Sequence, residues 1–187
     1  MSKLNLLDFS STKAKIKYNC AKQAIEISRI SPGELYPDFN FFSELLKSEN
    51  NILKWTAIKV IGNLSKVDDE KKIDRILPFI ITFLSNKSMI TAANTIGALS
   101  EIAINRSEFL DEIITSLLQV EKTSYYNKGE ISPECRNVAI GHVIKAFQNL
   151  DKKIYYRKDV YEFLKRQTLN TRPKVKKLAE KLLSKFT

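Results

Sequence analysis

Residues 53–64 read Leu-Lys-Trp-Thr-Ala-Ile-Lys-Val-Ile-Gly-Asn-Leu. A large apolar residue at Leu53 is followed by a basic residue, then by a small residue four positions after the start. Further apolar residues follow at eight and eleven positions, Ile61 and Leu64. The offsets 0, 4, 8 and 11 lie on one face of an α-helix. The stretch therefore predicts an amphipathic helix that buries this face.

The same pattern recurs about every forty residues along the chain. Successive copies are spaced by 37, 38, 44 and 40 residues, with starts at Ile16, Leu53, Thr91, Cys135 and Val175. In four of the five copies the second residue is basic: Lys17, Lys54, Arg136 and Lys176. A repeat of this length suits one helix pair per repeat. A non-repeating helical bundle is the alternative, and the recurring basic residue weighs against it.

A second amphipathic helix precedes each later copy of the pattern. We call the helices that carry the pattern B helices and the preceding ones A helices, and we expect A helices over 38–47, 70–84, 109–120 and 156–167. Prolines mark expected helix starts at Pro37, Pro133 and Pro173, because a missing N–H costs nothing there. Five Gly and five Pro are too few for many tight turns. We expect an all-α chain without strands, a single domain over 1–187 with about five helix pairs in an α-α superhelix.

Several short segments resemble the HEAT repeat family. Residues 76–84 contain the leucine-proline pair typical of its A helices, and the B-helix pattern matches its apolar-basic-x-x-small sequence. Residues 132–136 and 172–176 are similar to the family's step from turn to B helix. The chain resembles this family over nearly its whole length. The resemblance implies an α-solenoid whose B helices line a concave surface, and it says almost nothing about function.

Positive charge is concentrated on the expected B helices. The net charge is +10, from 31 basic and 21 acidic residues, and nearly all of the excess falls on these helices. A concave basic surface would attract phosphates or acidic protein segments. The candidate contact residues occupy the outward positions of the pattern: Lys22, Arg29, Lys59, Lys66, Lys145, Lys181 and Lys185. The alternative is an ordinary solvated face in a lysine-rich chain.

The wider spacing before the fourth copy marks an insertion over residues 122–130. It joins an A helix to its own B helix and contains two adjacent tyrosines, Tyr125 and Tyr126. Tyrosines in a polar loop could stack on bases or contact a protein. The alternative is a tyrosine that folds back onto the helices.

Few residues suit catalysis or metal binding. The single histidine, His142, reads as structural, and a usual zinc site needs more ligands. Cys20 and Cys135 read as small buried residues in a reducing cytosol, with a disulfide as the alternative. We find no glycine-rich phosphate loop, and we expect no cofactor, no metal and no enzymatic activity. A HEAT-like DNA glycosylase fits the fold, but no Asp lies in the expected B helices and the only tryptophan, Trp55, reads as core.

These features together predict a cytoplasmic, non-enzymatic binding module. No apolar run reaches the roughly 18 residues of a membrane span, and the first residues are too polar for a signal peptide. We expect neither a membrane nor a small-molecule substrate as partner. The leading partner is a protein with an acidic segment, and nucleic-acid backbone binding is the alternative. Lys outnumbers Arg by 24 to 7, which favours the protein because bidentate phosphate and guanine contacts prefer Arg.

Overall fold

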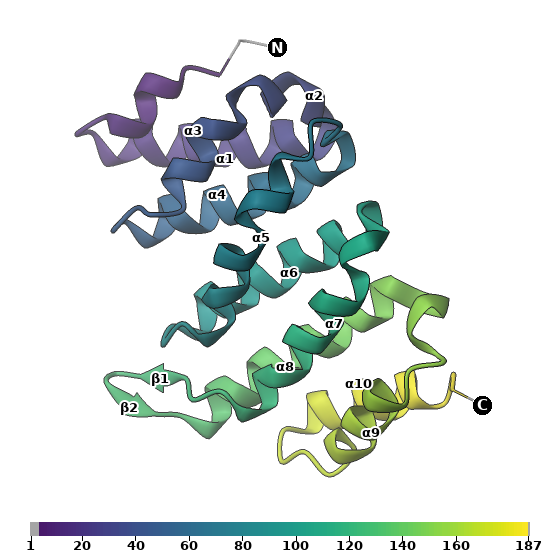
Figure 1. The fold of residues 1–187 in the computed structure, drawn as a ribbon. Helices are drawn as coiled ribbons and strands as arrows, with labels where there is room; N and C mark the ends of the chain where they lie inside the picture. Colours follow the sequence, from purple (N-terminus) through teal and green to yellow (C-terminus); the bar gives the residue numbers. More distant parts are fainter. Residues whose placement is uncertain (1–3, 187) are drawn as a thin grey trace. The chain divides into compact units, whose positions relative to one another are not determined.

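The computed structural model describes residues 4–186 (Figure 1). It forms two compact units. Unit 1 ends at Ile80, and unit 2 begins at Ile81, so the boundary lies within helix α5. Within each unit α-helices pack against α-helices, and the all-α fold is confirmed. The expectation of one domain over 1–187 stays a prediction.

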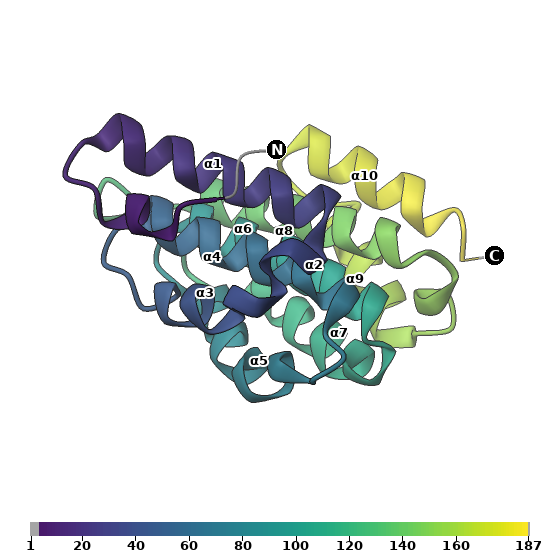
Figure 2. The same ribbon diagram turned by 90° about the horizontal axis from the view of Figure 1, so that it is seen from above.

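Unit 1 is built around two neighbouring B helices. These are α1 (Ala14–Ile30) and α4 (Asn51–Leu64), which lie side by side (Figures 1 and 2). All four pattern positions of α4 are buried, as residues 53–64 predict. The other elements are α2 (Pro32–Leu35), α3 (Phe39–Leu45), most of α5 (Lys72–Thr82) and 3-10 turns at Leu6–Ser10, Tyr36–Asp38 and Ser65–Val67.

The start of α5 is fixed by a buried carboxylate. Asp68 accepts hydrogen bonds from the backbone N–H groups of Lys72 at 2.8 Å and Ile73 at 3.1 Å. It also accepts one from the hydroxyl of Tyr36 at 2.8 Å. Capping of this kind stabilises a helix by about 0.5–2 kcal/mol. One acidic residue therefore links the start of an A helix to the turn before α3.

Unit 2 contains three successive B helices. These are α6 (Met89–Asn105), α8 (Pro133–Leu150) and α10 (Pro173–Leu183), and α8 packs against both of the others. Pro133 and Pro173 begin their helices, as predicted. The A helices are α7 (Leu110–Leu118) and α9 (Lys158–Gln167), with 3-10 turns at Phe83–Ser85, Ser107–Phe109, Gln119–Lys122 and Asp151–Ile154.

The expectation of a chain without strands is wrong in the insertion of unit 2. There β1 (Tyr126–Asn127) pairs antiparallel with β2 (Glu130–Ile131). The two residues between them, Lys128 and Gly129, have φ angles of 51° and 88°. Two consecutive positive φ angles define a type I′ turn, whose twist matches that of a hairpin. The glycine makes this turn accessible, so a tight hairpin forms where the sequence predicts a polar loop.

Candidate anion-binding pocket

A small pocket lies between the B helices α8 and α10 of unit 2. Its volume is about 70 Å³, which exceeds the roughly 10–15 Å³ that one water requires. The α8 side contributes Val138, Gly141, His142 and Lys145, and the α10 side contributes Arg172, Lys174, Val175 and Leu178. Half of these residues are basic or imidazole groups and the other half are nonpolar. The pocket therefore combines nonpolar walls with a high density of positive charge.

Close packing of the two helices depends on Gly141. A Cβ atom at this position would lie 3.3 Å from Cγ2 of Val175, which is tighter than an ordinary van der Waals contact. Gly141 and Val175 are both buried. The missing side chain thus lets α10 approach α8 and brings the basic residues of both helices to one opening.

Two lysines at this opening have no acidic partner among the described residues. Lys145 and Lys174 are exposed, and neither makes an ion pair. Arg172 pairs with Glu134, which does not line the pocket. The electrostatic potential at the opening is therefore positive, and it attracts anions.

The imidazole of His142 responds to this environment. Burial lowers its pKa below the ordinary value, and the ammonium groups of Lys145 and Lys174 lower it further. Burial disfavours the charged ring, and a nearby like charge does the same. His142 is therefore neutral at neutral pH, and the positive charge of the pocket resides on its lysines and arginine.

Further lysines continue along α10 beyond the pocket. Lys177 and Lys181 follow Lys174 at spacings of three and seven residues, which places the three on one helix face. All three are exposed, as is Lys185 just after the helix. The pocket thus opens beside a stripe of positive charge on the last B helix.

The other predicted basic contact residues lie in unit 1. Lys22 and Arg29 are exposed on α1, Lys59 is exposed on α4, and Lys66 is exposed in the following turn. Arg29 donates to both carboxylate oxygens of Glu26, at 3.2 and 2.7 Å, so its charge is already balanced. Of the predicted set only Lys145 lines the pocket.

The two predicted loop tyrosines have different environments. Tyr125 is 0% exposed, and its hydroxyl donates a 2.7 Å hydrogen bond to the carbonyl of Leu84. Burial raises its pKa to about 12. Its assignment as a partner-contact residue is corrected, because the ring folds back onto the helices and meets no solvent. Tyr126 is half-buried, with Nζ of Lys87 5.4 Å from its ring centroid.

Of the four basic or imidazole residues that line the pocket, the sequence predicted only Lys145 as a contact residue and missed His142, Arg172 and Lys174. The spacing of three residues between His142 and Lys145 signals a shared helix face. No sequence signal joins these two to Lys174, because that proximity arises only from the packing of α10 on α8. The sequence predicts a structural role for His142, and the structure places its ring at this basic opening.

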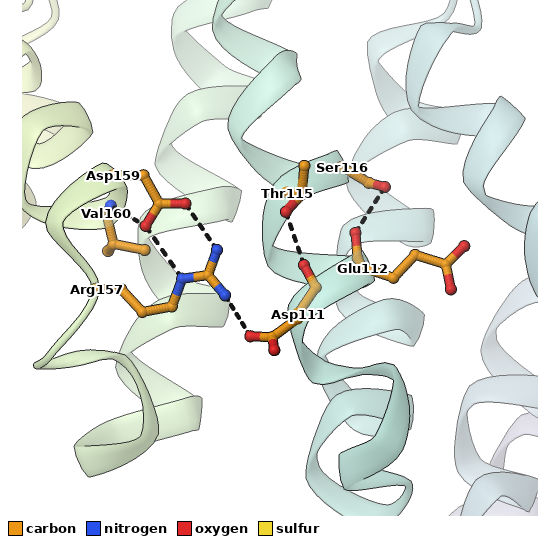
Figure 3. Close-up of polar contacts among 7 residues, drawn as sticks. All are labelled: Asp111, Glu112, Thr115, Ser116, Arg157, Asp159 and Val160. Carbon is orange, nitrogen blue, oxygen red and sulfur yellow. Dashed lines mark hydrogen bonds and ion pairs between the residues drawn. The ribbon is translucent and has the colours of Figure 1, made fainter.

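On the side of unit 2 where the A helices lie, arginines are paired with carboxylates (Figure 3). Nε and Nη2 of Arg157 donate to the two carboxylate oxygens of Asp159 at 3.1 and 2.7 Å, and Nη1 donates to Asp111 of α7. The guanidinium holds the pKa of the Asp159 carboxyl below its usual value. Glu121 accepts from Arg166 and from the buried amide of Gln167. Arginines here join consecutive A-helix segments.

Two other features bear on function. None of the helices within residues 4–186 combines the length and apolarity that a membrane span needs. In the same part of the chain no three His, Cys, Asp or Glu side chains are grouped as metal ligands. Both cysteines are free thiols, and burial followed by the charge of Asp8 raises the pKa of Cys20 to about 11.

Comparison with known proteins supports the fold alone. The crystal structure of an engineered protein aligns with a TM-score of 0.50 and 14% identity, covering 96% of this chain and 94% of that one. Two more engineered proteins align with TM-scores of 0.48 and 0.47 at 12% and 14% identity. They cover 97% and 95% of this chain, and 96% and 56% of their own. No protein-family model and no curated protein matches the chain. The first alignment supports the all-helical fold.

Proposed function

We propose that this chain is a HEAT-like solenoid that binds an acidic segment of a protein partner and catalyses no reaction. The observation that carries this proposal is the α8–α10 pocket, where Lys145 and Lys174 flank nonpolar walls without an acidic partner. A peptide offers both kinds of group that such a pocket can contact, carboxylates for the lysines and apolar side chains for the walls. We place the chain in the cytoplasm, where two free thiols stay reduced.

Nucleic-acid backbone binding is the second candidate, because of one specific observation. Lys174, Lys177 and Lys181 form an exposed stripe on α10, and such a row can follow successive phosphates. The two candidates differ in how they depend on salt. Each neutralised phosphate of duplex DNA contributes about 0.9 to the slope of log K against log salt. An acidic peptide that also buries apolar side chains keeps part of its affinity when charges are screened.

A fluorescence anisotropy titration separates these candidates. The probes are a labelled peptide of alternating Glu and Leu, a neutral Gln–Leu peptide, and a short DNA duplex, each at roughly 0.05 and 0.15 M salt. We expect saturable binding of the acidic peptide at both salt concentrations and little binding of the other two. Stronger binding of DNA than of the acidic peptide at the higher salt would favour the second candidate. Absence of any binding at low salt would remove both.

A matched pair of variants tests whether the pocket is the contact surface. Lys145→Glu reverses a charge at the pocket, and Lys165→Glu reverses one on the exposed face of α9. We expect Lys145→Glu to weaken peptide binding by about tenfold, or ~1.4 kcal/mol. Lys165→Glu carries the same change in net charge and should alter binding by less than about twofold. Equal losses in both variants would indicate a response to net charge and contradict the pocket assignment.

A further inference from the structure

We propose that the α8–α10 pocket takes a phosphoryl group, so that the bound acidic segment carries a phosphorylated serine or threonine at this point. This inference rests on the proposed function and specifies its ligand. The nonpolar walls alone would accept many side chains. The choice of a phosphoryl group comes from the balance of charge, the supply of hydrogen-bond donors and the size of the pocket.

The charge at the opening exceeds what one carboxylate can neutralise. Lys145 and Lys174 contribute two positive charges without an acidic partner, and no acidic side chain lines the pocket. A carboxylate carries one negative charge. A phosphomonoester carries about −1.5 to −2 at pH 7. One phosphoryl group therefore balances both lysines, whereas one carboxylate balances a single lysine.

The donors around the pocket call for a ligand rich in acceptors. Each lysine ammonium has three N–H donors and no acceptor, and the Arg172 guanidinium also only donates. A phosphoryl group presents three acceptor oxygens, whereas a carboxylate presents two. The exposed side chains of Lys145 and Lys174 come from different helices, so they can approach a tetrahedral group from two sides.

The size of the pocket limits what carries the phosphoryl group. Its volume of about 70 Å³ is near half of the ~150 Å³ cavity that accommodates a benzene ring. An aromatic side chain therefore does not fit inside together with its phosphate. Phosphoserine and phosphothreonine have short side chains that add little to the phosphoryl group itself, so they suit a pocket of this volume.

Three peptides test this inference. They share one sequence with flanking Glu residues and differ at a central position, which is serine, glutamate or phosphoserine. By anisotropy at roughly 0.15 M salt, we expect the phosphoserine peptide to bind about tenfold more tightly than the glutamate peptide, because it adds charge-assisted hydrogen bonds. Lys174→Met should abolish this preference. Lys165→Met, which removes a charge from the exposed face of α9, should preserve it.

The pKa of the single histidine provides a second measurement, which is independent of the binding titration. His142 is the one histidine of the chain, so its ring proton signals in an NMR pH titration need no further assignment. A bound dianion near Lys145, Lys174 and Arg172 reverses the local charge, and we expect it to raise the pKa of His142. The phosphoserine peptide should produce a larger increase than the glutamate peptide.

The outcomes separate the inference from the function on which it rests. If phosphoserine and glutamate peptides bind equally, the phosphoryl assignment is overturned and the acidic-segment function stands. If no peptide binds, the proposed function fails, and this inference fails with it. A preference that survives Lys174→Met, with no change in the His142 titration, would place the phosphoryl contact elsewhere and overturn the assignment.

Discussion

Arg157 and Lys174 carry the same charge in the same unit, yet the side chains around them differ. Arg157 is held by two carboxylates, and its side chain is 21% exposed (Figure 3). Lys174 is exposed and has no acidic partner among the described residues. At Arg157, positive charge joins consecutive A-helix segments of the fold. At the α8–α10 pocket, the charge of Lys174 remains available to a ligand. The comparison shows that two cations of one unit differ in role because only one of them has acidic neighbours.

The largest expected effect tests the A-helix side. Glu121 accepts hydrogen bonds from Nη2 of Arg166 at 2.6 Å and from the amide of Gln167 at 3.1 Å. Glu121→Ala leaves that buried amide without its partner, so we expect the free energy of unfolding to fall by about 2–3 kcal/mol. Urea denaturation followed by circular dichroism measures it. Glu112→Ala removes an exposed carboxylate of α7 and should change stability by less than about 0.5 kcal/mol. Equal losses of stability in Glu121→Ala and Glu112→Ala would contradict a structural role for the ion pairs of the A-helix side.

A smaller loss is expected when the arginine of Figure 3 is removed. Arg157→Met keeps the apolar stem but leaves Asp159 and Asp111 without the guanidinium. Because the Asp111 side chain is 87% exposed, water solvates the freed charge, and we expect a loss of about 1–2 kcal/mol. Thermal unfolding measures the difference, which should shrink in roughly 1 M salt as the pair is screened. A difference independent of salt would indicate that Arg157 acts by packing alone.

The pocket makes a weaker contribution to stability, and that contribution depends on pH. Burial and then Lys145 and Lys174 hold the pKa of His142 below its unfolded value of about 6.5. The unfolded chain therefore binds this proton more readily, so stability is fully present above about pH 6.5 and declines as pH falls toward the folded pKa. Melting temperatures at roughly pH 7.5 and 5.5 should diverge more in the wild type than in His142→Gln. Lys174→Met should reduce this divergence, and an unchanged divergence would contradict the proximity of the two groups.

The smallest stability effect is expected for the pocket lysines themselves. Lys145→Met and Lys174→Met each remove a charge that has no acidic partner, so the free energy of unfolding should change by less than about 0.5 kcal/mol. The change should be toward greater stability, because Lys145 and Lys174 line the same pocket and removing one charge lowers the repulsion on the other. Urea denaturation measures both variants. Losses as large as that of Arg157→Met would mean that the lysines support the fold and are not free for a ligand.

The repeat pattern predicted most of the helices from sequence. Residues 53–64 form α4 with its pattern face buried, because apolar spacing and helix geometry are both local properties. The pattern is weaker at the N-terminal end, where Ile16 is 39% exposed. Phe9, in a segment that the sequence analysis regarded only as polar, is buried beside Phe41 and Phe42 with centroids 5.3 and 6.0 Å away. One aromatic residue in a polar segment gives no periodic signal.

The candidate pocket was predictable only in part. Lys145 was found because the charge of a B helix can be counted from sequence. The sequence does not predict that Lys174 and His142 share a pocket with Lys145, because the proximity of Lys174 to the other two depends on the close approach of α10 at Gly141. Tyr125 was assigned to the surface because the loop around it is polar, and its hydrogen bond to Leu84 spans 41 residues of sequence. Contacts over such separations carry no local pattern.

The hairpin in the insertion has a practical consequence for protein engineering. Its base is anchored by the buried ring of Tyr125, and its tip, Lys128 and Gly129, is exposed with open space around the glycine. Exposed loop tips are the sites where insertions and circular permutation succeed. New chain ends opened between these two residues would leave every helix of unit 2 intact. A fluorescent dye or an affinity tag grafted there would report on the chain without disturbing the helices that bear the pocket.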